Sequence, residues 1–260
     1  MTPASILEAP EVAPPVVELI YEDGIPMESH QARKQMSLLI LLTHQLMAAR
    51  GCEDYFAGGN MFLYFSVEQA RRRDYRGPDY FAVLDVDGRR SRKAWVVWEE
   101  DGRCPNVIVE LLSETTREMD LGVKKRIYET VLRTPEYYCF DGERGELIGW
   151  RLMGGTYRAI EPGAAGRLDS EQLGVRLGLW HGEVEREDGV WLRFYDHEGH
   201  LLPTPEEAAA SLVEAERQRA DAAQQRADAE QQRADAERAR ADRLFARLRA
   251  LGHDPESGTD

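Results

Sequence analysis

The chain has 260 residues, of which 47 are acidic and 33 basic, so its formal net charge at pH 7 is -14. This balance argues against general electrostatic binding to nucleic acid, and any contact with a polyanion would need a local basic patch or a bound metal ion. Cys52, Cys104 and Cys139 are too few for a complete disulfide framework, which favours a reducing cytoplasmic location. We expect no signal peptide, because the N-terminus lacks a basic region, and no membrane span, because the longest apolar run covers only residues 38–42.

The first fifth of the chain is expected to change from disorder to a strand and then to a helix. Residues 1–15 are rich in Pro, Ala and Glu, a composition typical of disordered segments. Residues 16–27 are expected to form a strand that enters a turn at Asp23-Gly24. Apolar spacing predicts a helix from Ser29 that ends near Gly51. The residues expected on its inner face are Met36, Leu39, Ile40, Thr43, Leu46 and Met47.

Short apolar runs separated by glycine and proline predict several strands in the middle of the chain. They fall in residues 56–66, 79–86, 95–98, 107–112, 136–141 and 146–152. A helix is expected from about Leu121, after the loop that follows Ser113. Further short strands between residues 156 and 202 extend the same domain, so we expect one domain over residues 16–204.

The C-terminal segment contains a seven-residue repeat. Arginines recur at positions 219, 226, 233, 240 and 247, which places like residues on one stripe of a helix. The repeat predicts a charged helix over residues 205–251, followed by a tail of residues 252–260. Its apolar stripe is mostly alanine, which buries little area, so a solvated single helix and a weak coiled coil both stay open. Leu244, Leu248 and Leu251 are candidate anchors if two copies pair as a homo-oligomer.

Two acidic residues stand in or at the start of apolar strands. Asp79 follows Pro78, and Glu110 interrupts the apolar run of residues 107–112. A buried carboxylate is strongly destabilising unless something compensates it. Mg²⁺ takes oxygen ligands, commonly one or two carboxylates, so a metal held by Asp79 and Glu110 would account for the buried acid. Lys124 follows in the next element and could orient a water and stabilise developing charge.

Each of these residues also has a simpler structural explanation. Aspartate after proline is common in turns, a glutamate in a strand can pair with a lysine, and a helix lysine is usually solvated. The basic cluster at residues 71–76 could contact phosphate or only keep a loop soluble. His197 and His200 lie three residues apart in a loop without an evident third ligand, which favours a solvated loop.

Several motifs occur in an order that resembles a known bacterial family. They are GGNMFLYFS, GPDYFAVLDV, PNVIVELLS, KKRIYE, TPEYYCFD and GWRL. Over roughly residues 18–205 the sequence resembles the Uma-type restriction-endonuclease-like family of the PD-(D/E)XK nuclease superfamily. The resemblance implies an α/β fold, with a mixed β-sheet flanked by helices, and a long C-terminal helix is also common in the family. It further implies a metal-dependent endonuclease that hydrolyses phosphodiester bonds, with Mg²⁺ or Mn²⁺ bound by Asp79 and Glu110.

The site lysine departs from the superfamily pattern. That pattern has a lysine two residues after the acid, where this chain has Leu112. In relatives of the family the lysine comes from the following helix, which indicates Lys124, with Lys125 as the alternative. Glu28 is an additional candidate acid near the site, and His30 a weaker candidate whose simpler role is a surface or capping residue.

Two functions from different classes therefore stay open. The first is an endonuclease acting on nucleic acid, with DNA favoured over RNA, in the cytoplasm and without a membrane. The second is a catalytically inactive nuclease fold that serves as a binding or scaffold module and oligomerises through its helical tail. The presence of both acids favours the first, whereas the acidic net charge and the displaced lysine favour the second.

Overall fold

A computed structural model describes residues 19–21, 29–72 and 77–251, and the structural statements below refer to these residues. The chain divides into two compact units, Met1–Thr204 and Pro205–Asp260. The predictions for residues 1–15 and 252–260 lie outside the described residues. Leu19–Tyr21 lies within the segment expected to be a strand, but these three residues are not in a strand. That part of the prediction is wrong.

The first unit is built on a six-stranded mixed sheet. Only β5 and β6 run parallel, and every other neighbouring pair is antiparallel. In spatial order the strands are β1 (Tyr55–Gly58), β3 (Tyr80–Leu84), β5 (Val107–Leu111), β6 (Glu136–Asp141), β7 (Glu146–Met153) and β8 (Thr156–Ala159). The implied α/β class with a mixed sheet is confirmed.

Two smaller sheets complete the unit. The strands β9 (Leu168–Ser170), β10 (Val175–Val184) and β11 (Glu187–Tyr195) form an antiparallel sheet of their own. The strands β2 (Leu63–Tyr64) and β4 (Trp95–Val96) form a short parallel pair. Short helical segments lie between strands at α2 (Val67–Arg71), η1 (Val97–Glu99) and η3 (Ala164–Gly166).

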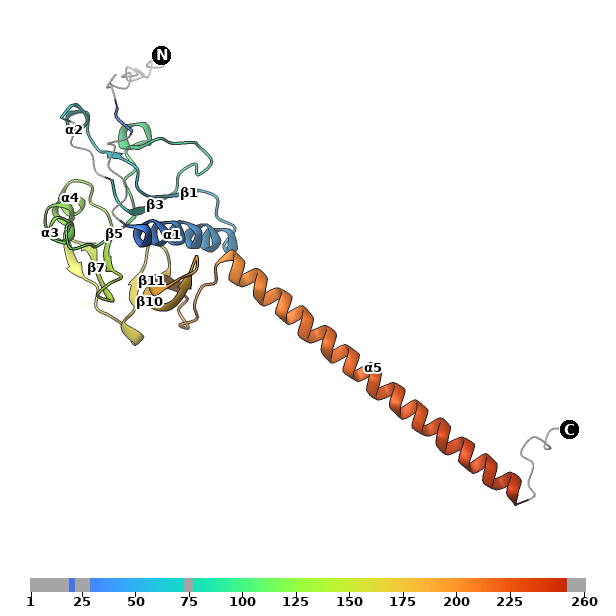
Figure 1. The fold of residues 1–260 in the computed structure, drawn as a ribbon. Helices are drawn as coiled ribbons and strands as arrows, with labels where there is room; N and C mark the ends of the chain where they lie inside the picture. Colours follow the sequence, from blue (N-terminus) through green and yellow to red (C-terminus); the bar gives the residue numbers. More distant parts are fainter. Residues whose placement is uncertain (1–18, 22–28, 73–76, 252–260) are drawn as a thin grey trace, which may run out of the picture. The chain divides into compact units, whose positions relative to one another are not determined.

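The first unit is crossed by the helix α1 (His30–Ala49), which lies between β3 and the β10–β11 hairpin (Figure 1). Ser29 is its N-cap, because the serine side chain accepts a hydrogen bond from the Ala32 N–H at 3.0 Å. Gly51 follows its C-terminal end with a φ of 64°, a left-handed conformation that glycine adopts without strain. Both predicted ends of this helix are confirmed.

The buried face of α1 differs in part from the predicted one. Met36 and Ile40 are only partly buried, although Ile40 packs against the apolar cluster of this face as predicted. Leu38 and Leu42 are buried in their place, while the other four predicted residues are buried as expected. Each fully buried leucine contributes about 2 kcal/mol of hydrophobic stabilisation, so this face holds the helix to the sheets.

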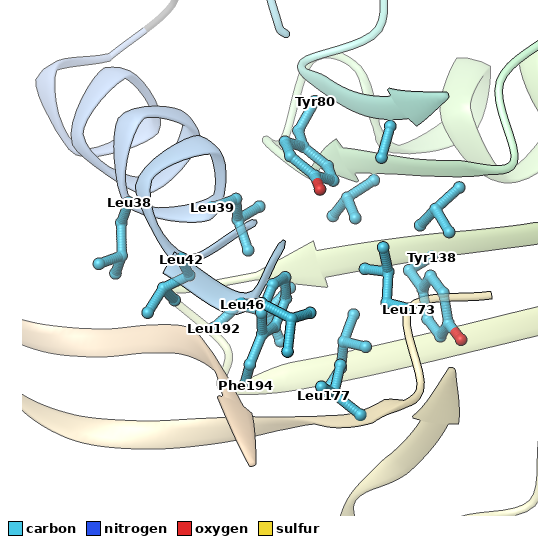
Figure 2. Packing of buried hydrophobic residues seen from close by; sticks show 14 of the residues in the cluster. Leu38, Leu39, Leu42, Leu46, Tyr80, Tyr138, Leu173, Leu177, Leu192 and Phe194 are labelled. Atoms are coloured by element: carbon cyan, nitrogen blue, oxygen red, sulfur yellow. The ribbon is translucent and has the colours of Figure 1, made fainter. Parts of the chain in front are cut away.

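Contacts with the β10–β11 hairpin bury two polar residues of α1. Lys34 Nζ lies 2.8 Å from Glu187 Oε2 and donates a hydrogen bond to the Glu185 carbonyl at 3.0 Å. The Gln35 side chain exchanges two hydrogen bonds with the backbone of Leu192. These contacts satisfy two polar side chains in the interior, which hydropathy alone assigns to the surface. Figure 2 shows the apolar packing in this layer, including Leu38, Leu39, Leu42, Leu46, Tyr80, Tyr138, Leu173, Leu177, Leu192 and Phe194.

The segment after β5 is helical but irregular. It consists of α3 (Arg117–Met119), a single π-helical turn η2 (Asp120–Lys124) and α4 (Lys125–Thr130). The helix therefore begins earlier than the predicted start at Leu121. The sequence offers no apolar period for a π turn, whose backbone bonds run from residue i to residue i-5.

The main sheet is buried on both faces, because side chains alternate along each strand. In β5, Val107 and Val109 join the apolar cluster that contains α1. Ile108 joins the opposite cluster, which contains Tyr128 of α4. By the same alternation Glu110 faces the side of the sheet that η2 and α4 cover. The fold thus explains why an acid in this strand meets the helical segment that follows it.

In the described part of the second unit, residues 205–251, the chain forms the helix α5 (Pro205–Ala250), as the repeat predicts. No residue of α5 is buried. Side-chain hydrogen bonds between residues four apart support the helix, including Gln224 to Asp228 at 2.8 Å and Gln231 to Asp235 at 3.1 Å. None of the described helices is long and apolar enough to cross a membrane.

Candidate functional site

Asp79 and Glu110 meet across two antiparallel strands. The register pairs Tyr80 with Val109, so the preceding Asp79 stands opposite Glu110. The Leu111 N–H donates to Asp79 Oδ2 at 2.7 Å, and the Asp79 N–H donates to Glu110 Oε2 at 3.3 Å. Each carboxylate therefore accepts a hydrogen bond from a backbone N–H of the neighbouring chain segment. This reciprocal pairing places the two acids on one side of the sheet.

Lys124 reaches the same place from η2. Its Nζ lies 3.2 Å from Glu110 Oε2 and 2.7 Å from Asp120 Oδ1. The side chain of Lys124 is 20% exposed, whereas those of Glu110 and Asp120 are 0% and 1% exposed. Lys125 points elsewhere, since its Nζ lies 4.0 Å from the centre of the Trp150 ring. The structure thus brings Lys124, and not the alternative Lys125, to the acids.

Asp120 is a site residue that the sequence reasoning missed. The available signal was the spacing of Asp120, Lys124 and Tyr128, which recur every four residues and so share one face of a helix. The Tyr128 hydroxyl donates to Glu110 Oε1 at 2.7 Å, and Lys124 links Asp120 to the same glutamate. Their shared period, rather than the lysine alone, identifies the face that covers β5.

The π turn fixes the position of Asp120. Its carbonyl accepts a hydrogen bond from the Lys125 N–H, five residues later. The same carbonyl accepts a second bond from the Tyr137 hydroxyl of β6 at 2.9 Å. The backbone of Asp120 is therefore tied to the sheet as well as to the helix. Single π turns inside helices are frequent at functional sites, where they redirect a side chain.

Burial and neighbouring charges shift the pKa values of the acids and of the lysine in this site. Burial is the main cause that raises the pKa of Glu110 to about 7; Lys124 opposes this rise and Asp79 adds to it. Burial is also the main cause that raises the pKa of Asp79 and that of Asp120. Burial alone would lower the pKa of Lys124, but the Glu110 and Asp120 carboxylates raise it above its usual value. The lysine is thus charged, and the acids resist losing their protons together.

The set of donors fits a hard divalent cation. Three carboxylates face one ammonium group, so full ionisation leaves an excess of negative charge within the site. Lys124 and the Thr116 side chain are the partners of the Asp120 carboxylate, and no further hydrogen bond reaches its two oxygens from the described residues. Carboxylate oxygens are the ligands that Mg²⁺ and Mn²⁺ prefer. A divalent cation would supply the charge that the ammonium alone does not.

A cleft of about 520 Å³ opens beside the end of β5. Its lining residues come from the first turn of α1, from the loop after β5 and from the end of β6, and include Ser29, Gln35, Leu111, Ser113, Thr115 and Gly142. The four charged site residues do not line the cleft. Leu111 and Phe140 line the cleft and pack with the apolar cluster that contains α1, whereas Glu110 faces the opposite side of the sheet. The cleft therefore lies at the end of β5, mainly on the side of the sheet away from the acids.

The remaining sequence candidates contribute less. Glu28 lies outside the described residues. His30 is the first residue of α1 and is exposed, with its Nδ1 3.4 Å from Arg33, as expected of a surface residue. Within the basic cluster only Arg71 and Arg72 are described, and both are exposed.

A second group of potential ligands lies in the loop after β11. The side chains of Asp196, Glu198 and His200 offer ligand atoms within 4.8 Å of one another. This group includes His200 but not His197, and Glu198 and His200 are exposed, as expected of a solvated loop. Asp196 accepts hydrogen bonds from the His200 backbone at 2.8 Å and lies 3.0 Å from its ring, so local bonding accounts for the cluster.

A protein-family model described as "Uma2: Putative restriction endonuclease" matches residues 7–185. The chain belongs to the Uma2 family. No curated protein matches it. Asp79, Glu110, Asp120 and Lys124 all lie within the part that matches the Uma2 model, whereas α5 lies beyond it. The Uma2 description suggests a nuclease that acts on nucleic acid and, as in restriction-endonuclease-like proteins generally, uses divalent metal ions.

Proposed function

We propose that this protein is a metal-dependent endonuclease that hydrolyses phosphodiester bonds, with DNA as its substrate. The observation that carries the proposal is the pairing of Asp79 and Glu110 across two strands, with Lys124 Nζ 3.2 Å from the glutamate. The match to the Uma2 family supports the same reaction class.

Asp79 and Glu110 would hold the metal, Mg²⁺ or Mn²⁺. Such an ion, when bound, lowers the pKa of a water molecule and polarises the phosphate. Backbone bonds fix both carboxylates on the sheet, so the site is preorganised before any ligand binds. The Tyr128 hydroxyl holds the second oxygen of Glu110, which leaves Oε2 directed toward Lys124.

Lys124 would orient the attacking water and stabilise the negative charge that develops on the phosphate. Its pKa is raised above the usual value by the neighbouring carboxylates, so it acts as a fixed positive charge and not as a base. The oxygen of the attacking water would bond to phosphorus while the bond from phosphorus to the leaving oxygen breaks. The proton of the water would pass to solvent, and the leaving oxygen would take a proton from solvent.

The proposal is tested by incubating the full chain with linear DNA, supercoiled DNA and RNA. We expect cleavage of DNA with Mg²⁺ or Mn²⁺, no cleavage with EDTA, and loss of cleavage in Asp79→Asn and Glu110→Gln. Glu136→Gln is the matched control, because Glu136 is equally buried but bonds to other partners. A chain that neither binds Mn²⁺ nor cleaves any nucleic acid would contradict the proposal.

A second function is favoured by one specific observation. The formal net charge is -14, and the cleft at the end of β5 is lined by Glu114 and Glu143, which oppose a polyanion. A catalytically inactive nuclease fold that acts as a binding or scaffold module, with an oligomerising α5, would fit this charge. Mn²⁺ binding without cleavage of any nucleic acid, together with concentration-dependent self-association, would favour that function.

A further inference from the structure

The acidic site contains one group that the Asp79, Glu110 and Lys124 arrangement does not use. Asp120 is 1% exposed, and apart from Lys124 and the Thr116 side chain its carboxylate has no hydrogen-bond partner among the described residues. A buried carboxylate in that state is strongly unfavourable unless a cation compensates it. Lys124 Nζ, 2.7 Å from Oδ1, is the cation that does so in this structure.

We propose that Asp120 is a third carboxylate of the divalent-cation site, and that Lys124 holds the place of the cation between Asp120 and Glu110 in the metal-free protein. This inference rests on the proposed function, because it assumes that the acids bind a metal. It goes further in adding a ligand and in giving Lys124 a role before the metal arrives.

The position of Lys124 supports this role. Its Nζ lies between the oxygens of two buried acids, 3.2 Å from Glu110 and 2.7 Å from Asp120. A single positive charge leaves three carboxylates under-compensated, whereas a divalent cation together with the ammonium balances them. The Lys124 side chain is 20% exposed, so it contacts solvent while it pairs with the two acids.

The backbone supports the role of Asp120. Its carbonyl is bonded both to the Lys125 N–H and to the Tyr137 hydroxyl, so the residue is held by helix and sheet together. In a regular α-helix the carbonyl of Asp120 would bond to the N–H four residues later instead of five, and the side chains of this turn would point in different directions. The π turn therefore selects the position from which Asp120 meets Lys124 and Glu110.

The test measures Mn²⁺ binding by the full chain, using calorimetry at pH 8 and the rise in melting temperature at saturating Mn²⁺. We expect Asp120→Asn to weaken Mn²⁺ binding by about 10–100-fold, the scale found when a supporting group at a metal site is lost. We expect Lys124→Met to strengthen Mn²⁺ binding by about tenfold or more, because a competing positive charge is gone. Lys124→Met should also melt at a lower temperature in EDTA and gain more from Mn²⁺ than the unmodified chain.

Two matched controls separate these effects from general loss of stability. Lys34→Met removes a buried lysine that is paired with Glu187 outside the site. Glu136→Gln removes the charge of a buried acid bonded to β9 and the residues after it. Both variants should lower the melting temperature in EDTA, yet leave the affinity for Mn²⁺ unchanged.

The outcomes are distinguishable. If the unmodified chain does not bind Mn²⁺, the proposed function and this inference are both wrong. If Asp79→Asn loses Mn²⁺ binding while Asp120→Asn keeps it, the inference alone is wrong. If Lys124→Met weakens Mn²⁺ binding, Lys124 does not hold the place of the cation. Should Asp120→Asn fail to fold, Lys124→Met still decides the question, because its expected change has the opposite sign.

Discussion

Two glutamates on neighbouring strands, Glu110 of β5 and Glu136 of β6, are equally buried but differently surrounded. Both side chains are 0% exposed. Glu136 accepts hydrogen bonds from the Ser170 hydroxyl at 2.5 Å and from the Glu171 N–H at 2.7 Å, and its Oε1 lies 3.3 Å from Arg151. It faces donors and a cation on every side and ties β6 to β9.

Glu110 has fewer donors and lies among other acids. It accepts bonds from the Tyr128 hydroxyl and the Asp79 N–H, and its cation is Lys124, whose Nζ lies 3.2 Å from Oε2. The same lysine also pairs with the buried Asp120 carboxylate. Besides burial, the Asp79 carboxylate raises the pKa of Glu110, and Glu110 raises the pKa of Asp120. Burial has the same cost in both places, so the number and charge of the partners make the difference. Glu136, with hydrogen bonds to both of its oxygens, has a structural role. Glu110, which lies among further carboxylates, has the surroundings of a cation ligand.

The largest expected effect is on catalysis at the Glu110 site. Lys124→Ala should lower the rate of nucleic-acid cleavage by about 10²–10⁴-fold, the usual scale for a positioned charge-stabilising group. Mn²⁺ should still bind, because the carboxylates are intact. Cleavage rates at saturating Mn²⁺ test this, with Lys125→Ala as the control because Lys125 Nζ lies over Trp150. Equal losses in both variants would contradict the assignment.

The next effect concerns stability at the Glu136 site. Glu136→Ala should lower the free energy of unfolding by about 3 kcal/mol, because Arg151 and several buried donors lose their shared acceptor. Urea unfolding measures this, and Mn²⁺ affinity of the folded variant should not change. If Glu136→Ala abolished Mn²⁺ binding without loss of stability, the distinction between the two glutamates would be wrong.

The pH dependence of stability sharpens the comparison. The pKa of Glu110 is raised from 4.5 to about 7, so the folded chain binds more protons than the unfolded chain between these values. Without metal, the free energy of unfolding should therefore fall as the pH rises through this window, by up to about 3 kcal/mol from this group. Glu110→Gln should flatten that fall and leave the protein more stable at pH 8. Urea unfolding in EDTA from pH 4.5 to 8 measures both, and equal slopes would contradict the raised pKa.

The smallest effect is expected from deleting α5. None of its residues is buried, so a chain that ends at Thr204 should keep nearly the melting temperature of the full chain. Sedimentation of both chains tells a single helix from an oligomerising one. A large drop in melting temperature would contradict this prediction and show that residues 205–251 stabilise the first unit.

Much of this protein could be predicted from local pattern. The alternation of apolar residues identified β3, β5, β6 and β7, and the seven-residue repeat identified α5. Glu110 was recognisable as an anomaly within an apolar strand, and Asp79 by its place before the neighbouring strand. These signals are local, because strand and helix periods depend only on which residues lie two or three to four positions apart.

The tertiary structure decided the rest. The register between β3 and β5 brings Asp79 opposite Glu110, and a π turn brings Asp120 and Lys124, rather than Lys125, to the same acid. Backbone partners on β11 bury Gln35, against its hydropathy. Each of these outcomes depends on groups distant in sequence, or on a backbone bond that no side-chain period encodes.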